Sequence, residues 1–410
     1  MTETSEEQSL DLNQKKRSLN IEIVTETYPP EINGVAHTIS MLVQGLRKNN
    51  NTVSVIRPRQ KSDQISQKDN FINRDCLVNS LPIPLYPELR MGMPKKNFLI
   101  TRWGKNRPDI VHIATEGPLG WSAVKAAREL NIPVTSDFRT NFHSYSSLYK
   151  VGFLKPLIMA YMKHMHNATD CTMVPTQKLS RDLQTSGINN LIVMPRGVDT
   201  TQFSTDRRSN SLRRSWNVEP SDVVLLCVGR LAVEKNLDLL IKSYKHAQAV
   251  DSSTKLVVVG DGPLRKSLEC LCADAIFAGI QRGTSLAEYY ASADVFVFPS
   301  MTETFGNVTI EAMASGLAVV AYDLAGAGEL IQSTVNGIVV EPNNEPAFIE
   351  AVQSIVMNKS LIQKLGQQAL HTAHQNSWEE IISRTEEIFK QVVDVKKSSQ
   401  ACHENFIIQT

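Results

Sequence analysis

Strong charge of either sign is absent from this sequence. Lys and Arg together number 43 and Asp and Glu number 42, which leaves a formal net charge of +1 at pH 7. The composition therefore gives no indication of nucleic acid as a partner. The chain has 410 residues, of which 42% are hydrophobic, so it is long enough to form two globular domains, each with a full core.

Cysteine patterns, targeting segments and long apolar runs are absent as well. The six cysteines have no metal-ligand spacing, and we interpret them as reduced thiols of a cytoplasmic protein that has no disulfide framework. Residues 1–18 are polar and lack the apolar segment of a signal peptide, so we expect a disordered tail there. No run approaches the roughly 18 apolar residues of a membrane-spanning helix. We recognise no metal site and no resident cofactor.

Two familiar nucleotide-binding signatures are also missing. GxxxxGK[ST] does not occur, which argues against a P-loop ATPase. Gly260-Asp261-Gly262 begins like the dinucleotide-binding pattern GxGxxG, but its sixth position is Arg265. The chain is therefore not predicted to bind a dinucleotide in the usual way.

Short apolar segments alternate with amphipathic ones along most of the chain, which is the pattern of parallel sheets covered by helices. We predict a first domain at residues 19–199, an interdomain linker at 200–220, a second domain at 221–377, a helix at 378–395 and a tail at 396–410. The predicted strands lie at residues 21–24, 52–57, 110–113, 133–136, 171–174, 191–194, 223–228, 255–259, 275–278, 294–298 and 317–321. Ligands of open parallel sheets bind beyond the carboxyl ends of such strands.

Two carboxylates, Glu303 and Glu311, stand on either side of a Phe-Gly-Asn turn that follows the apolar strand 294–298. We expect a helix to begin near Asn307 and to end before Gly316. The backbone N–H groups at its start can bind an anion, with a carboxylate on either side for hydroxyl groups. Glutamate near a helix N-terminus is also ordinary capping electrostatics. The pattern favours a ligand that carries both phosphate and hydroxyls, as a sugar nucleotide does.

Basic residues that suit a diphosphate occur directly after another predicted strand. Arg230 and Lys235 are five residues apart in the loop beyond strand 223–228. A guanidinium fork and an ammonium group offset the charge of a diphosphate, both when it is bound and when it departs. The Gly-Asp-Gly-Pro turn at 260–263 follows the next strand, and Gly34 lies in the first strand-to-helix loop, where it lets a ligand approach the backbone.

At this point several segments carry a resemblance to a known family. GRLAVEKN at 229–236, GDGP at 260–263, ETFGNVTIEAMASG at 303–316 and NGIVVEP at 336–342 resemble the donor half of family 4 glycosyltransferases. Residues 22–39 and 196–203 are similar to the other half. The branch that looks nearest includes GDP-mannose-dependent mannosyltransferases, sulfoquinovosyltransferases and diacylglycerol glycosyltransferases.

The resemblance implies an α/β fold of the GT-B type, in which two Rossmann-like domains face each other across a donor and acceptor cleft. It also implies transfer of a hexosyl group from a UDP- or GDP-hexose with retention of configuration, without a DxD metal site. The C-terminal helix would cross back to the first domain.

The resemblance also implies roles for individual residues. Arg230 and Lys235 would hold the diphosphate, Glu311 the ribose hydroxyls, and Glu303 the hexose. Gly34 would shape the wall of the cleft that the first domain contributes. The backbone amides beside the phosphate or sugar would be those of Phe305, Gly306, Asn307 and Val308. The two glutamates are then binding groups, because an acid and nucleophile pair needs carboxyls that flank one bond.

One position departs from the family pattern. Relatives in this branch commonly carry a His directly before Thr-Asn-Phe, whereas this chain has Arg139 there and His143 four residues later. We expect Arg139 to take the catalytic place beside the donor, with His143 as the second candidate and a plain loop histidine as the alternative. A guanidinium here suits a donor that bears a carboxylate or sulfonate. An unchanged preference between UDP-glucuronate and UDP-glucose in Arg139→His would contradict this hypothesis.

The acceptor is predicted from two basic and apolar segments of the first domain, residues 88–107 and 153–164. Such surfaces suit docking to an anionic bilayer, so we expect a lipid acceptor such as diacylglycerol and peripheral contact with the inner face of the cytoplasmic membrane. A solvated basic face and a core helix are the simpler readings of these segments. Transfer to a growing polysaccharide or a small soluble acceptor stays open. Sugar-nucleotide 2-epimerases share the fold and form the alternative class.

Overall fold

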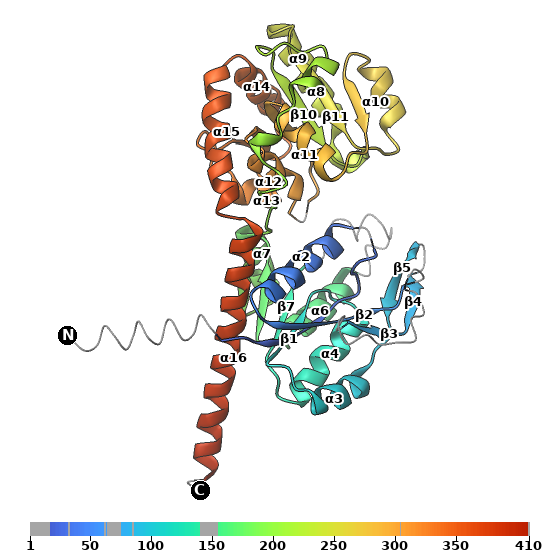
Figure 1. Cartoon of the computed structure of the whole chain (residues 1–410), viewed down its shortest axis with the longest axis vertical. Coiled ribbons are helices and arrows are strands. Elements are labelled where there is room, and N and C mark those ends of the chain that lie inside the picture. The colour runs from blue at the N-terminus through green and yellow to red at the C-terminus, as the bar shows by residue number, and fades with distance from the viewer. Residues whose placement is uncertain are drawn as a thin grey trace, which may run out of the picture.

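The computed structural model describes residues 17–31, 33–60, 63, 75–83, 86–139, 155–303 and 305–408. Two parallel sheets, each covered by helices, form two domains that lie one above the other in Figure 1. The sheet of the first domain has the order β3-β2-β1-β6-β7-β8-β9, and that of the second has the order β12-β11-β10-β13-β14-β15. A short antiparallel hairpin, β4-β5, stands beside the first sheet.

The first sheet is built from strands that are mostly buried on both faces, because helices cover both sides. In β1 the side chains of Ile21, Ile23 and Val24 are fully buried, and Ile21 pairs with Ile110 of the neighbouring strand. The strands are β1 (Asn20–Val24), β2 (Thr52–Pro58), β3 (Asp75–Val78), β6 (Ile110–Ile113), β7 (Val134–Asp137), β8 (Cys171–Val174) and β9 (Leu191–Val193). The hairpin consists of β4 (Ser80–Ile83) and β5 (Tyr86–Gly92). Neither β3 nor the hairpin is among the strands expected from the sequence.

The helices of the first domain follow from local patterns of the sequence. In α2 (Gly34–Lys48), Asn33 caps the start by accepting a hydrogen bond from the Ala36 N–H at 2.8 Å, and Ile39, Val43 and Leu46 form the buried face. The other helices are α3 (Lys96–Lys105), α4 (Pro118–Glu129), α6 (Lys155–His166) and α7 (Gln177–Thr185).

The second domain repeats the alternation of strand and helix. Its strands are β10 (Val224–Val228), β11 (Lys255–Val259), β12 (Ile276–Gly279), β13 (Val295–Phe298), β14 (Ala318–Tyr322) and β15 (Ile338–Val340). Its helices are α9 (Leu237–Val250), α10 (Arg265–Leu271), α11 (Gly283–Ser292), α12 (Asn307–Ala314), α13 (Ala325–Leu330), α14 (Glu345–Val356) and α15 (Lys359–His374), with a short 3-10 turn, η3 (Val233–Lys235). Two apolar clusters, one on each face of the sheet, make up its core.

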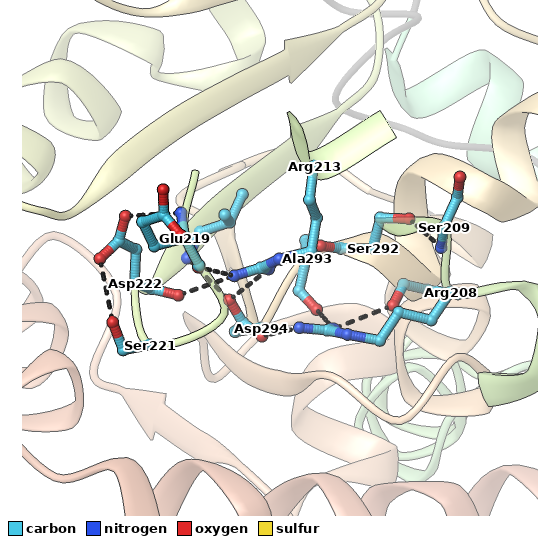
Figure 2. Close-up of polar contacts among 11 residues, drawn as sticks. Arg208, Ser209, Arg213, Glu219, Ser221, Asp222, Ser292, Ala293 and Asp294 are labelled. Carbon is cyan, nitrogen blue, oxygen red and sulfur yellow. Dashed lines mark hydrogen bonds and ion pairs between the residues drawn. The ribbon is translucent and has the colours of Figure 1, made fainter. Parts of the chain in front are cut away.

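The segment expected to be a linker at 200–220 is folded onto the second domain. It contains a 3-10 turn, η2 (Thr205–Arg207), and a helix, α8 (Asn210–Ser215). Figure 2 shows Arg208 and Arg213 converging on Asp294, with N–O distances of 2.8 and 3.0 Å. Arg213 is buried and also donates to the backbone carbonyls of Ser292, Glu219 and Asp222. These hydrogen bonds make the basic segment a structural part of the second domain.

The last helix, α16 (Trp378–Ile408), lies on the first domain, as Figure 1 shows in red. Trp378, Ile382 and Phe389 are buried in the core of the first domain beside α2. Lys396 also forms an ion pair with Asp170 at 2.8 Å. The helix does not end at 395, as the sequence suggested, but continues through the polar stretch to Ile408. Of the expected tails, residues 1–16 and 409–410 lie outside the described part of the chain.

Candidate functional site

A pocket of about 400 Å³ lies where the loops after β10 and β13 meet the start of α12. It collects most of the residues that the sequence singled out in the second domain. The lining consists of Val228, Gly229, Arg230, Glu234, Lys235, Thr302, Glu303, Gly306, Asn307 and Val308. Thr302 and Glu234 were not anticipated, although Glu234 lies between the two expected cations in the sequence.

The two cations of the pocket are each held by a carboxylate. The Arg230 guanidinium donates to Glu234, and it is largely exposed. The Lys235 ammonium donates to Glu303, which also accepts from the Ser300 hydroxyl at 3.0 Å. Lys235 is mostly buried and lies over the ring of Phe298, 5.5 Å from its centroid. A phosphate that enters the pocket would meet both cations and would compete with the two glutamates for them.

Two glycines bring the neighbouring loops of this pocket into backbone contact. A Cβ atom at Gly260 would lie 1.9 Å from the carbonyl oxygen of Gly229, and one at Gly262 would lie 2.4 Å from that of Leu231. Gly260 also has φ +134°, which is strained for any side chain. The Gly-Asp-Gly turn therefore supports the Arg230 loop from behind, as the sequence suggested by placing both at one sheet edge.

The start of α12 points its backbone N–H groups at the same pocket. Gly306 is the cap residue, with φ +84° and no side chain to occupy the first turn, so the amides of Asn307 and Val308 line the pocket. Phe305 is buried beneath the turn, and its carbonyl accepts the Gly326 N–H at 2.7 Å. The partial positive charge of the helix start thus lies beside Arg230 and Lys235, which suits an anion.

Glu311 lies one turn further along α12 and outside the pocket lining. Its carboxylate accepts the Tyr290 hydroxyl at 2.9 Å. The residue keeps some exposed surface, but protein surrounds the carboxylate, and this burial raises its pKa to about 7 although the hydrogen bond from Tyr290 opposes the shift. A carboxylate with this pKa is only partly ionised near neutral pH.

The expected site residues of the first domain, Gly34 and Arg139, do not line the pocket of the second domain. Gly34 begins α2, is exposed, and has open space where a Cβ would be. The Arg139 guanidinium is 6% exposed and is bonded to Asp137, and the Arg139 backbone N–H donates to Glu116 at 2.8 Å. His143 lies outside the described residues. Arg139 is therefore held inside the domain in this structure and does not line the pocket of the second domain.

Asp137 lies at the end of β7 beside two guanidinium groups and a histidine ring. Besides Arg139, the guanidinium of Arg196 and the ring of His112 lie 3.8 and 3.7 Å from its carboxylate. Burial alone would raise the pKa of Asp137, but Arg139, His112 and Arg196 outweigh it and hold that pKa well below its usual range. Burial and the nearby Arg139 lower the pKa of Arg196 to about 10. The sequence did not single out Asp137 or Arg196, because their pairing depends on where the ends of separate strands meet.

A further carboxylate of the first domain, that of the partly buried Glu26, was not anticipated from the sequence. It follows β1 and accepts the backbone N–H groups of Gly92 at 2.5 Å and Leu119 at 2.9 Å. Burial raises its pKa to about 7, and the backbone hydrogen bonds oppose the shift. Glu26 thus ties the end of the β4-β5 hairpin and the first turn of α4 to the edge of the sheet.

Comparison with known proteins agrees with this geometry. A model described as "Glycosyltransferase Family 4" matches residues 32–202, and one described as "Glycosyl transferases group 1" matches residues 209–372. A GDP-mannose-dependent alpha-mannosyltransferase of Corynebacterium glutamicum is 30% identical over 92% of this chain and 90% of its own length. The chain belongs to glycosyltransferase family 4. It is a hexosyltransferase that uses a nucleotide-sugar donor.

A further relative and a solved structure extend the comparison. An alpha-monoglucosyldiacylglycerol synthase of Streptococcus pneumoniae is 27% identical over 78% of this chain and 74% of its own length. The crystal structure of Anabaena HepE in complex with UDP superimposes with a TM-score of 0.71 at 17% identity, covering 91% of this chain and 100% of that one. The fold is therefore GT-B, as the sequence predicted.

Neither a metal site nor a membrane span emerges from the described residues. No group of three or more His, Cys, Asp or Glu side chains in that part of the chain is placed to hold a metal ion. Within the same residues, every helix is too short or too polar to cross a bilayer.

Proposed function

We propose that this glycosyltransferase moves a hexosyl group from a nucleoside-diphosphate hexose to a hydroxyl of a membrane lipid, with retention of configuration. The observation that carries the donor half is the convergence of Arg230, Lys235 and the amide end of α12 on one pocket. The diphosphate binds there. It replaces Glu234 as the partner of Arg230 and Glu303 as the partner of Lys235. The ribose hydroxyls reach Glu311, and the hexose lies against Glu303.

The same contacts account for departure of the nucleotide. As the glycosidic bond breaks, negative charge grows on the leaving diphosphate, and the two cations together with the amides of Asn307 and Val308 stabilise it. The acceptor hydroxyl attacks from the face that the diphosphate leaves, and its proton passes to an oxygen of the departing diphosphate. Glu303 serves as a binding group and does not form a covalent intermediate. NMR of the product's anomeric centre tests retention, and an inverted product would contradict this route.

A donor screen tests the donor half directly. Thermal stability and slow donor hydrolysis are measured with GDP-mannose, UDP-glucose, UDP-galactose, UDP-glucuronate and UDP-N-acetylglucosamine. GDP-mannose comes first because it appears in the name of the Corynebacterium relative. A donor at a hundred times its Kd should stabilise the chain by about 2.7 kcal/mol.

Two lysines of the second domain make a matched pair for this screen. Lys235→Ala removes a cation of the pocket and should abolish the donor-induced shift and reduce hydrolysis at least about 100-fold. Lys242→Ala removes an exposed lysine on α9, paired with Glu345 and remote from the pocket lining, and should behave as wild type. Equal effects of the two substitutions would place the donor elsewhere. Conversion of the donor to its 2-epimer, without transfer, would establish the epimerase alternative.

The acceptor half of the proposal rests on the surface of the first domain. α3 and α6 carry Lys and Arg but no acid, and each exposes a large apolar side chain, Phe98 at 45% and Leu157 at 67%. This combination suits the inner face of an anionic cytoplasmic membrane. The diacylglycerol acceptor in the name of the Streptococcus relative supports a glycerolipid. Transfer to a polysaccharide or a soluble acceptor is the competing outcome.

Vesicle co-sedimentation tests this surface. The wild type should sediment with anionic vesicles at low salt and less at high salt, because salt screens the attraction. Phe98→Ser combined with Lys105→Glu should weaken sedimentation, whereas Lys266→Glu on α10 changes charge equally at an exposed site of the second domain and should not. Absence of wild-type binding at low salt would exclude the membrane as the site of the acceptor.

A further inference from the structure

A second pocket, of about 450 Å³, lies in the first domain between α3, α4 and α6. Figure 1 shows α3 and α4 side by side beneath the sheet. Its walls are mostly apolar and include Pro94, Pro118, Trp121 and Tyr161, with Lys96 and Lys125 also in the lining. Nothing in the proposed donor site uses these residues.

The polar groups of this pocket already have partners. The Tyr161 hydroxyl donates to the Glu116 carbonyl at 2.8 Å, and the Ser122 hydroxyl donates to the Leu119 carbonyl at 2.8 Å. Lys96 is paired with Glu129 at 2.5 Å. A sugar would therefore find few groups for its hydroxyls here, and binding it would leave polar atoms unpaired. A hydrocarbon chain requires no such partners and gains from burial against the ring and proline surfaces.

The basic side chains suit the head-group region of a bilayer. Lys125 lies over the Trp121 ring, with its ammonium 4.8 Å from the centroid, so the indole is covered by a cation on one side. Lys and Arg on the three helices are opposed by a single acid, Glu129. Aromatic rings beside lysines are typical of surfaces that sit at a membrane interface.

The pocket also opens at the edge of the sheet where ligands are expected. Glu116 and Pro118 follow β6, and the Glu116 carboxylate accepts the backbone N–H of Arg139 beyond the adjacent strand β7. Glu26 fixes the first turn of α4 to the same edge. The walls are thus held in place by hydrogen bonds to the ends of the strands, and the pocket is preformed.

From these contacts we propose that the pocket between α3, α4 and α6 binds an acyl chain of the glycerolipid acceptor. The volume fits part of one lipid, and the polar groups that already have partners favour hydrocarbon. Lys96 and Lys125 in the lining suit the head-group region of the bilayer. The acceptor hydroxyl is then held at the strand-end edge that faces the donor. This inference rests on the proposed lipid glycosyltransferase activity and adds the place where the lipid is anchored.

A substitution at Trp121 tests the proposal through kinetics. Trp121→Glu puts a carboxylate in the path of the chain and should raise the KM for dioctanoylglycerol in mixed micelles about tenfold or more, because a few buried methylene groups account for that factor. Trp121→Phe keeps an apolar ring and should stay within about twofold of wild type. Donor hydrolysis without acceptor should be the same in all three proteins. An unchanged KM in a folded Trp121→Glu variant would overturn the proposal.

A direct measurement covers the case in which Trp121→Glu does not fold. A diacylglycerol with a diazirine at the end of one acyl chain is photolysed with the wild-type chain, and the adducts are mapped by mass spectrometry. Adducts should fall on peptides of α4 and α6 and should disappear in the presence of unlabelled dioctanoylglycerol. Adducts found only elsewhere would overturn the pocket while leaving the activity intact. Failure of the wild type to hydrolyse any donor would instead count against the proposed function.

Discussion

At the scale of single residues, Asp137 balances the charge of two buried guanidinium groups in the first domain. It is buried between the guanidinium groups of Arg139 and Arg196 and beside His112. Two buried cations that lose their common anion cannot regain water, so the cost of removing Asp137 far exceeds the net value of the ion pairs. The cluster positions Arg139, and any contact of Arg139 with a donor must begin from this bound state.

We expect Asp137→Asn to lower the free energy of unfolding by about 3–5 kcal/mol, because it leaves buried charges without compensation. Urea unfolding at pH 7 measures the loss. Asp182→Asn, at an exposed site of α7, is the control and should change it by less than about 0.5 kcal/mol. The pKa of Asp137 is lowered by folding, so its contribution is complete above about pH 4 and is lost only as the pH falls towards the folded-state value.

Glu311 gives the opposite dependence on pH. Folding raises its pKa to about 7, so the folded state holds a proton that the unfolded state has lost. Its contribution to stability is therefore greatest at low pH and declines as the pH rises from about 4.5 to 7. Relative to Glu311→Gln, the wild type should lose about 2 kcal/mol of unfolding free energy between pH 5 and pH 8. If the unfolding free energies of the two proteins change in parallel with pH, folding does not raise the pKa of Glu311.

At the scale of elements, α16 packs closely against α2 of the first domain. A Cβ at Gly45 of α2 would lie 1.9 Å from Cδ1 of Ile382 on α16, so the two helices approach each other where one has no side chain. Asn49 near the end of α2 donates to Glu386 of α16 at 3.0 Å. The glycine is therefore explained by packing, since it is otherwise unfavourable within a helix.

Substitution of glycine by alanine raises helix propensity at both sites but causes overpacking at only one, so the two variants should change stability in opposite directions. Gly45→Ala should destabilise the chain by about 1–3 kcal/mol, because the gain in helix propensity is smaller than the cost of overpacking against Ile382. Gly104→Ala on α3 has nothing within 4 Å of the new Cβ and should stabilise it by up to about 1 kcal/mol. Thermal or urea unfolding of both variants measures the difference. Adding Ile382→Ala to Gly45→Ala should recover part of the lost unfolding free energy. If the losses of the two single variants simply add in the double variant, the proposed contact between residues 45 and 382 is wrong.

The central strands, and the loops that line the pocket of the second domain, were predictable because their signals are local. Residues 256–259 are an uninterrupted apolar run and Ile110–Ile113 is apolar except for His112, and the structure confirms a strand at each place. The hairpin at 80–92 was missed because proline and charged residues interrupt its pattern. The end of α16 was placed too early because the chain turns polar after Val395, although no proline or glycine ends the helix. Arg139 could not be oriented from the sequence, because Asp137 and Arg196 come from different strand ends.

At the scale of the whole molecule, α13 of the second domain meets α7 of the first domain. The Glu329 carboxylate at the end of α13 accepts the backbone N–H of Gln177, the first residue of α7, at 2.7 Å. A negative charge at a helix start is favourable, so this bond joins the second domain to the first. The bond is exposed, and a weak link of this kind leaves the two domains free to move relative to each other.

Glu329→Gln should therefore change the arrangement of the domains more than their stability. We expect a loss of less than about 1 kcal/mol in unfolding free energy but a larger radius of gyration by small-angle X-ray scattering. The wild type should show the same expansion at high salt, which screens the charge. Glu350→Gln, an exposed substitution on α14, is the control. Identical scattering curves for all proteins would show that the contact does not hold the domains.

The packing of α16 has a consequence for synthesis on the ribosome. The first domain begins near residue 17, yet Trp378, Ile382 and Phe389 complete its core. While the chain is being translated, the apolar face of α2 that packs against α16 stays uncovered until α16 emerges. The second domain, encoded later, contains its own core residues up to Ala373 and can finish first. Maturation of this enzyme should therefore run from the second domain to the first, against the direction of translation.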